Sequence, residues 1–77
     1  MNRYQLERKL QDNFIPNYLY NLYGTGRTDE RLCLEKIKED KWQVYYEERG
    51  EKTSVWKFES EDEACSYIWE ELKKEKG

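Results

Sequence analysis

The chain has 77 residues, which allows one small domain over residues 1–77 and leaves no room for a second. Charged residues make up 40% of the sequence and aromatic residues 16%, so large rings must supply the core that the sparse aliphatic residues cannot build. The net charge is −3, and residues 59–71 hold six acids and no base, which argues against the concentrated basic surface that nucleic-acid binding needs.

The chain begins with a predicted helix over residues 2–13. Leu6 and Leu10 lie four positions apart on one side of it, and Phe14 continues the same apolar stripe. Pro16 ends the helix, because the residue before a proline is disfavoured in the α region.

The connector over residues 15–30 is harder to assign. Within it, residues 17–23 are compatible with an irregular or helical turn and equally with an edge strand. Residues 24–29 are predicted to form a loop, since two glycines there can adopt positive φ.

Three strands are predicted next, over residues 31–38, 42–48 and 53–59, joined by turns at 39–41 and 49–52. Side chains alternate along a strand, so each strand has two faces. One face of the resulting antiparallel meander is strongly apolar and carries Trp42, Val44, Tyr46, Trp56 and Phe58. The opposite face is predicted to be exposed to solvent or to a partner, and it carries Gln43, Tyr45, Glu47, Val55 and Lys57.

The last predicted element is a helix that starts after Ser60. The Ser60 hydroxyl can accept from the N–H of Glu63 while the Glu63 carboxylate reaches back to Ser60, which is a capping box. Its apolar stripe, which should dock on the sheet, consists of Ala64, Cys65, Ile68 and Leu72. The expected fold is therefore α+β, in the order helix, three-stranded antiparallel meander, helix (α-β-β-β-α), with both helices on one sheet face.

No chemistry-bearing motif stands out. The chain has no histidine, its carboxylates lie in hydrophilic runs, and no phosphate loop or dinucleotide motif is present, so we expect neither catalysis nor a cofactor. The spacing of Cys33 and Cys65 fits no metal site, and both are expected to be reduced and buried. Without a signal peptide or a membrane span, the chain is expected in the cytoplasm with no membrane partner. It is also expected to be a monomer or a weak dimer.

The helix-meander-helix order is also that of the double-stranded-RNA-binding domain, a resemblance of topology alone. Such modules approach phosphates with lysines at the start of the last helix, where this chain has Glu61, Asp62 and Glu63. These carboxylates would repel a duplex, so a nucleic-acid partner is not expected.

A closer resemblance rests on the central and C-terminal residues. The chain resembles small immunity proteins of bacterial polymorphic and contact-dependent toxin systems over roughly residues 15–72, in the motifs Ile15-Pro16-x-x-Leu19-Tyr20, Trp42-x-Val44-Tyr45-Tyr46-x-Glu48-Arg49-Gly50 and Phe58-x-Ser60-Glu61-x-Glu63-Ala64-Cys65-x-Tyr67. This resemblance implies a cytoplasmic inhibitor that binds its cognate toxin domain, often a nuclease, and occludes it without catalysis.

The same resemblance, read with the charge pattern, suggests where the toxin binds. An acidic surface with aromatic anchors suits a basic partner, because carboxylates raise the association rate and rings bury area. The expected toxin-binding residues are Glu61, Asp62, Glu70 and Glu71, with Tyr45, Arg49 and Tyr67 as secondary contacts. Dipole complementation at the helix start is the competing explanation for Glu61 to Glu63. The alternative function is a small non-enzymatic adaptor or regulatory subunit.

Overall fold

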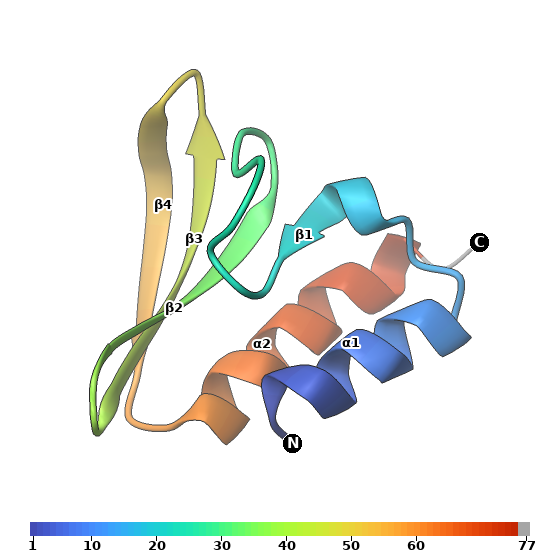
Figure 1. Ribbon diagram of the computed structural model, residues 1–77, viewed down its shortest axis with the longest axis horizontal. Coiled ribbons are helices and arrows are strands. Elements are labelled where there is room, and N and C mark those ends of the chain that lie inside the picture. Colours follow the sequence, from blue (N-terminus) through green and yellow to red (C-terminus); the bar gives the residue numbers. More distant parts are fainter. Residues whose placement is uncertain (76–77) are drawn as a thin grey trace.

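The computed structural model describes residues 1–75 and shows two helices beside a four-stranded sheet (Figure 1). Along the chain the elements are α1 (Arg3–Asp12), η1 (Asn17–Leu19), β1 (Tyr20–Asn21), β2 (Leu32–Lys38), β3 (Lys41–Glu48), β4 (Glu51–Phe58), α2 (Glu61–Leu72) and η2 (Lys73–Glu75). The predicted α+β class and the helix-meander-helix order are confirmed, with one additional short strand. Residues 76 and 77 of the predicted domain lie outside the described residues.

Local capping explains where α1 begins and ends. The Asn2 side chain accepts a hydrogen bond from the N–H of Gln5, and the Gln5 side chain accepts one from the N–H of Asn2. At the other end the N–H of Ile15 donates to the carbonyl of Leu10 at 3.0 Å, and Phe14 has a φ of 59°. Phe14 is the left-handed residue that ends the helix and is 80% exposed, so the prediction that it continues the buried stripe was wrong.

The segment that the sequence left open forms one 3₁₀ turn, η1, followed by β1. This short strand pairs in parallel with the start of β2. Asn21 holds the loop that follows, because its side chain accepts from the N–H of Gly24 at 2.8 Å and donates to the carbonyls of Thr25 and Arg27 at 2.9 and 2.8 Å. The connector therefore returns the chain to the sheet before the meander begins.

The sheet has the order β1-β2-β3-β4, parallel between the first two strands and antiparallel elsewhere. We call the face toward the helices the inner face. Three rows of side chains cross it, in the register Leu32–Tyr46–Ser54, Leu34–Val44–Trp56 and Lys36–Trp42–Phe58. The predicted assignment of the apolar side chains to one face is confirmed.

β3 and β4 are joined by Arg49 and Gly50, whose φ angles are 54° and 81°. A two-residue loop with both φ angles positive matches the twist of the flanking strands, and glycine adopts such an angle without steric cost. The Arg49 N–H also donates to the Asp29 carboxylate at 2.7 Å. Because the turn is this tight, β4 starts at Glu51, earlier than predicted.

α2 begins as predicted at Ser60, whose hydroxyl accepts from the N–H of Glu63 at 3.1 Å. The Glu63 carboxylate accepts from the Ser60 hydroxyl at 3.2 Å, instead of from the backbone N–H that the capping box predicted. The predicted apolar stripe docks on the inner face, and all its members are buried: Ala64, Cys65, Ile68 and Leu72.

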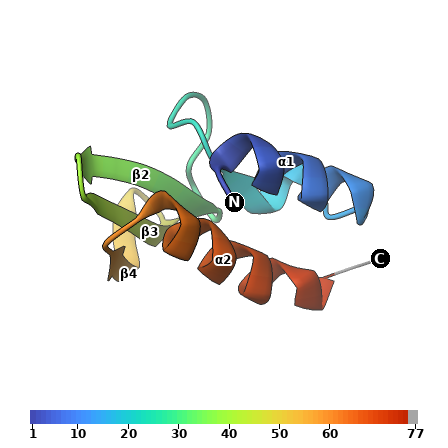
Figure 2. The same cartoon turned by 90° about the horizontal axis from the view of Figure 1, so that it is seen from below.

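α2 lies across the inner face, and α1 lies beside α2 (Figures 1 and 2). Leu6 and Leu10 of α1 share one buried cluster with Ile68 of α2 and Val44 of β3. The helices therefore cover one face of the sheet, as expected.

The outer face of the sheet is less exposed than predicted. Gln43 and Tyr45 are each 8% exposed, so the expectation that both are open to a partner was wrong. Gln43 donates to the carboxylate of Glu35, and the Lys52 ammonium lies 4.4 Å from the centre of the Tyr45 ring. Long side chains from the two neighbouring strands thus cover the central strand. Val55, on the edge strand β4, is 43% exposed, in agreement with the prediction.

The loop over residues 22–31 covers another part of the outer face. The Thr28 hydroxyl donates to the Glu47 carboxylate at 2.9 Å, and the Glu30 N–H donates to the Glu47 carbonyl at 2.6 Å. The Cys33 sulfur lies 3.6 Å from the carbonyl oxygen of Thr28. These contacts anchor the loop to β2 and β3.

Both cysteines are free and buried, as predicted. Burial raises the pKa of the Cys33 thiol and of the Cys65 thiol to about 11 each. Both thiols are therefore protonated and unreactive at neutral pH in the folded chain.

Candidate protein-binding surface

Three half-buried rings, which we call the aromatic cluster, lie between β4 and α2: Trp56, Phe58 and Tyr67. The Tyr67 ring centre is 5.0 Å from that of Trp56 and 5.5 Å from that of Phe58. Burial raises the pKa of the Tyr67 hydroxyl, and Glu71 adds to the effect. The rings pack against the core and still expose part of their surface. Rings in this position are suited to anchor a partner.

A groove of about 390 Å³, the inner groove, adjoins this cluster. Its floor is formed by inner-face side chains of three strands, namely Leu32, Tyr46, Ser54 and Trp56. Its walls come from η1, the loop before β2 and the end of α2 with η2, and they carry Leu19, Glu30, Glu71, Leu72 and Glu75. The groove therefore combines an apolar floor with an acidic rim.

The charged groups of the inner groove are three carboxylates, Glu30, Glu71 and Glu75. Glu71 accepts from the Lys74 ammonium at 3.3 Å, whereas Glu30 and Glu75 form no ion pair within residues 1–75. Burial raises the pKa of the Tyr46 hydroxyl, and Glu30 raises it further. This excess of carboxylates favours a positively charged group at the rim.

The side of α2 that carries Tyr67 is also acidic. Glu63 lies four residues before Tyr67 and Glu70 three residues after it, so helical geometry puts all three on one side. Glu70 pairs with Lys73 at 2.7 Å. We call Glu63, Glu70 and Glu71 the acidic side of α2.

Glu61 and Asp62 hold the start of α1 instead of joining this surface. The Glu61 carboxylate accepts from the Arg3 N–H at 3.0 Å and lies 3.7 Å from the Arg3 guanidinium. Asp62 binds the terminal ammonium of Met1 and so raises the pKa of that ammonium. Glu61 and Asp62, both predicted to bind the toxin, therefore connect the start of α2 to the start of α1.

Tyr45 and Arg49 are also separated from the aromatic cluster. Tyr45 lies on the opposite face of the sheet, where burial, reinforced by Cys33, raises its pKa to about 12. Arg49 is exposed at the tip of the β3–β4 hairpin. Of the seven residues predicted for toxin binding, the structure brings together three, namely Tyr67, Glu70 and Glu71.

The acid run at residues 59–71 is largely compensated in the fold. Five of its six carboxylates have ion-pair partners: Glu59 with Lys41, Glu61 with Arg3, Asp62 with the terminal ammonium, Glu70 with Lys73 and Glu71 with Lys74. The three lysine pairs are exposed, and exposed pairs contribute about 0–1 kcal/mol, so an incoming base can replace these lysines at small cost.

Residues 1–75 contain no group of three or more His, Cys, Asp or Glu side chains placed to hold a metal ion. Within the same residues, no helix has both the length and the apolar composition to cross a membrane. No protein-family model, curated protein or solved structure matches this chain.

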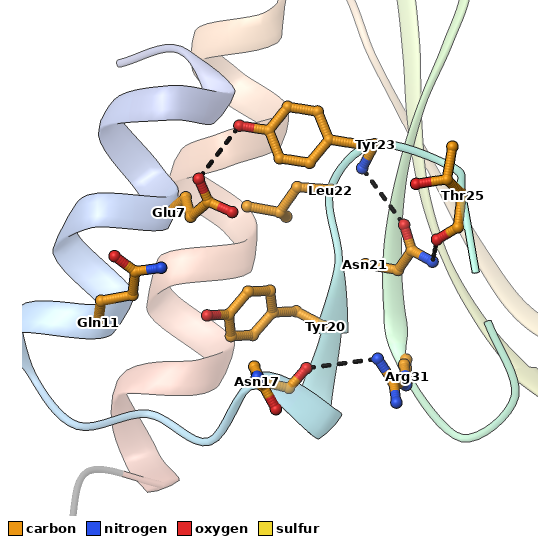
Figure 3. A pocket seen from close by; sticks show the side chains of 9 residues that line it. All are labelled: Glu7, Gln11, Asn17, Tyr20, Asn21, Leu22, Tyr23, Thr25 and Arg31. Atoms are coloured by element: carbon orange, nitrogen blue, oxygen red, sulfur yellow. Dashed lines mark hydrogen bonds between the residues drawn. The ribbon is translucent and has the colours of Figure 1, made fainter. Parts of the chain in front are cut away.

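A second cavity, of about 360 Å³, lies between α1 and β1 and is mainly polar (Figure 3). The Tyr23 hydroxyl donates to the Glu7 carboxylate at 3.3 Å, and the Arg31 guanidinium donates to the Asn17 carbonyl at 3.5 Å. Burial raises the pKa of Tyr20 at its centre, and Glu7 adds to the effect. Because this cavity holds one charge of each sign, it selects less strongly for a charged partner than the inner groove does.

Sequence reasoning missed most of the inner groove. The sequence places Trp56 wholly in the core and Leu19 in a connector laid over the core, and it contains no pattern that puts Glu30 or Glu75 beside them. Leu19 and Glu30 lie in segments without a regular apolar pattern, so periodicity carries no signal for their place in the groove.

Proposed function

We propose that this chain is a cytoplasmic immunity protein that binds and neutralises a cognate bacterial toxin domain without catalysis. One observation carries the proposal: a half-buried aromatic cluster adjoins a groove whose charged groups are all carboxylates. The resemblance of the aromatic strand, the Arg49-Gly50 turn and the capped helix to small immunity proteins supports the same function.

The physical basis is complementarity with a nuclease. A nuclease binds its substrate through a basic cleft, and an acidic domain can occupy that cleft while its rings bury area at the centre of the contact. In this proposal Trp56 and Tyr67 are the anchors, and Glu70 and Glu71 exchange their lysine partners for bases of the toxin. Glu61 and Asp62 then contribute indirectly, by holding α1 in place.

Co-expression with the toxin domain encoded by a neighbouring gene tests the proposal. We expect the chain to restore growth of cells that produce the toxin and to co-purify with it as a stoichiometric complex. An adaptor would bind a partner without protecting cells. Absence of both protection and complex formation with that toxin would overturn the proposed function.

Charge reversal tests whether the acidic side of α2 makes the contact. We expect the Glu70→Lys, Glu71→Lys double variant to lower the association rate by about tenfold at low salt, since steering depends on charge. Asp12→Lys is the control, because it reverses an exposed carboxylate on α1 that does not line the inner groove. Equal association rates for both variants would exclude steering by Glu70 and Glu71.

A further inference from the structure

The strand β4 is the long open edge of the sheet. Within the described residues it pairs with β3 alone, whereas the opposite edge of the sheet is β1, a strand of two residues. An edge strand presents unpaired backbone N–H and C=O groups that can accept another strand. After the register shift between Tyr46 and Glu47, the regular pairing with β3 runs from Ser54 to Phe58. This five-residue stretch is the part of the edge best suited to strand pairing.

The usual protection of an edge is weak along this stretch. Lys52 points back over the outer face, where its ammonium lies 4.4 Å from the centre of the Tyr45 ring and 3.7 Å from the Glu35 carboxylate. Val55, the second residue of the stretch, is 43% exposed, and no proline interrupts the stretch. Lys57 is the remaining charged side chain there, on the outer face beside Val55.

The inner-face side chains of β4 determine which residue types suit a strand that pairs with this edge. Side chains on the inner face of an added strand would lie next to Trp56 and Phe58. Beyond these rings stands α2, whose nearby side carries Tyr67 with Glu63 and Glu70. Lysine or arginine suits this position, because its methylene stem covers a ring while its charge reaches a carboxylate.

We propose that the partner docks by adding a strand to β4 at Ser54–Phe58, with lysine or arginine at the alternate positions that face the aromatic cluster. The inference rests on the proposed function in taking a basic protein as the partner. It adds the mode of recognition, in which backbone hydrogen bonds provide affinity and alternate basic side chains provide specificity.

A second copy of the chain fits this edge less well. Two copies joined edge to edge by a two-fold axis would place their helices on the same side of the joined sheet. The carboxylates Glu63 and Glu70 of each copy would then face those of the other, and like charges oppose such pairing.

The test uses the full ¹⁵N-labelled chain and a synthetic peptide in which lysine alternates with threonine. We expect saturable amide shifts at residues 54–58 and at Tyr67, with slower hydrogen exchange along β4. A peptide with glutamate in place of lysine should produce neither effect. The Glu63→Gln, Glu70→Gln double variant should weaken binding of the lysine peptide several-fold, whereas Asp12→Asn should leave it unchanged.

Three outcomes would overturn the inference. They are no saturable shift at millimolar lysine peptide, shifts confined to residues outside β4 and α2, and β4 protection that increases with the concentration of the chain itself. Exchange measured in the toxin complex separates this inference from the proposed function. A toxin that binds without protecting β4 contradicts strand addition alone, whereas peptide docking on β4 without any toxin binding contradicts the immunity function alone.

Discussion

Replacing Phe14 by glycine should stabilise the domain. Phe14 occupies the position after the C-cap of α1 with a φ of 59°, where its N–H donates to the Gln11 carbonyl at 3.0 Å. For a residue with a Cβ, the left-handed conformation costs about 1–2 kcal/mol of folding free energy. Glycine avoids this cost, but ordering its more flexible backbone costs about 0.5–1 kcal/mol more than ordering that of alanine. The ring is 80% exposed, so its removal costs little buried area. The net expectation is a gain of about 0.5–1 kcal/mol in the free energy of unfolding for Phe14→Gly.

Thermal unfolding measures this gain, which for a domain of this size corresponds to a rise of about 4 °C in Tm. Phe14→Ala is the matched control, because it removes the same ring and keeps the Cβ that makes the conformation unfavourable. Phe14→Gly should therefore melt above Phe14→Ala as well as above the parent. If the two variants melt at the same temperature, the left-handed C-terminus of α1 is not the source of the strain.

Three further predictions concern the core, a cap and the thiols. Trp42→Ala should lower the free energy of unfolding by about 3–5 kcal/mol, since the ring is 6% exposed; a melt like that of the parent would contradict its place in the core. Ser60→Ala should cost about 1 kcal/mol in chemical denaturation, and the control Ser66→Ala, inside α2, should cost clearly less. Cys33 and Cys65 have pKa values of about 11 in the fold and 9.0 when unperturbed, so the unfolded chain loses these protons first. The contribution of the thiols to stability should be full below pH 9 and should fall as the pH rises to 11, by up to roughly 3 kcal/mol per thiol; a denaturation midpoint that rises in this range would refute the assignment.

Much of the fold was predictable because its signals are local. The alternation from Trp42 to Tyr46 assigns the inner face, and the register bears this out. Ser60 marks the start of α2 because a cap involves residues three positions apart. Gly50 marks the β3–β4 turn because a two-residue loop requires a positive φ, which glycine adopts without steric cost. In each case the interacting groups are neighbours along the chain.

The candidate surface was predictable only in part. Tyr67, Glu70 and Glu71 share one side of α2, as helical spacing requires. The groove beside them also draws Leu19 and Glu30 from segments that have no regular pattern. Their approach to α2 depends on how the connector folds back over the sheet, which periodicity does not encode.

The sequence by itself determined the two long helices, the three strands of the meander, the inner face of the sheet and the negative charge of the C-terminal part of the chain. Only the tertiary structure decided that Tyr45 is covered, that Glu61 and Asp62 hold α1, and that Phe14 is exposed at a strained position. The physical reason is the distance along the chain over which each effect acts. Alternation and capping join residues a few positions apart, whereas burial and ion pairing join residues that become neighbours only after the chain has folded.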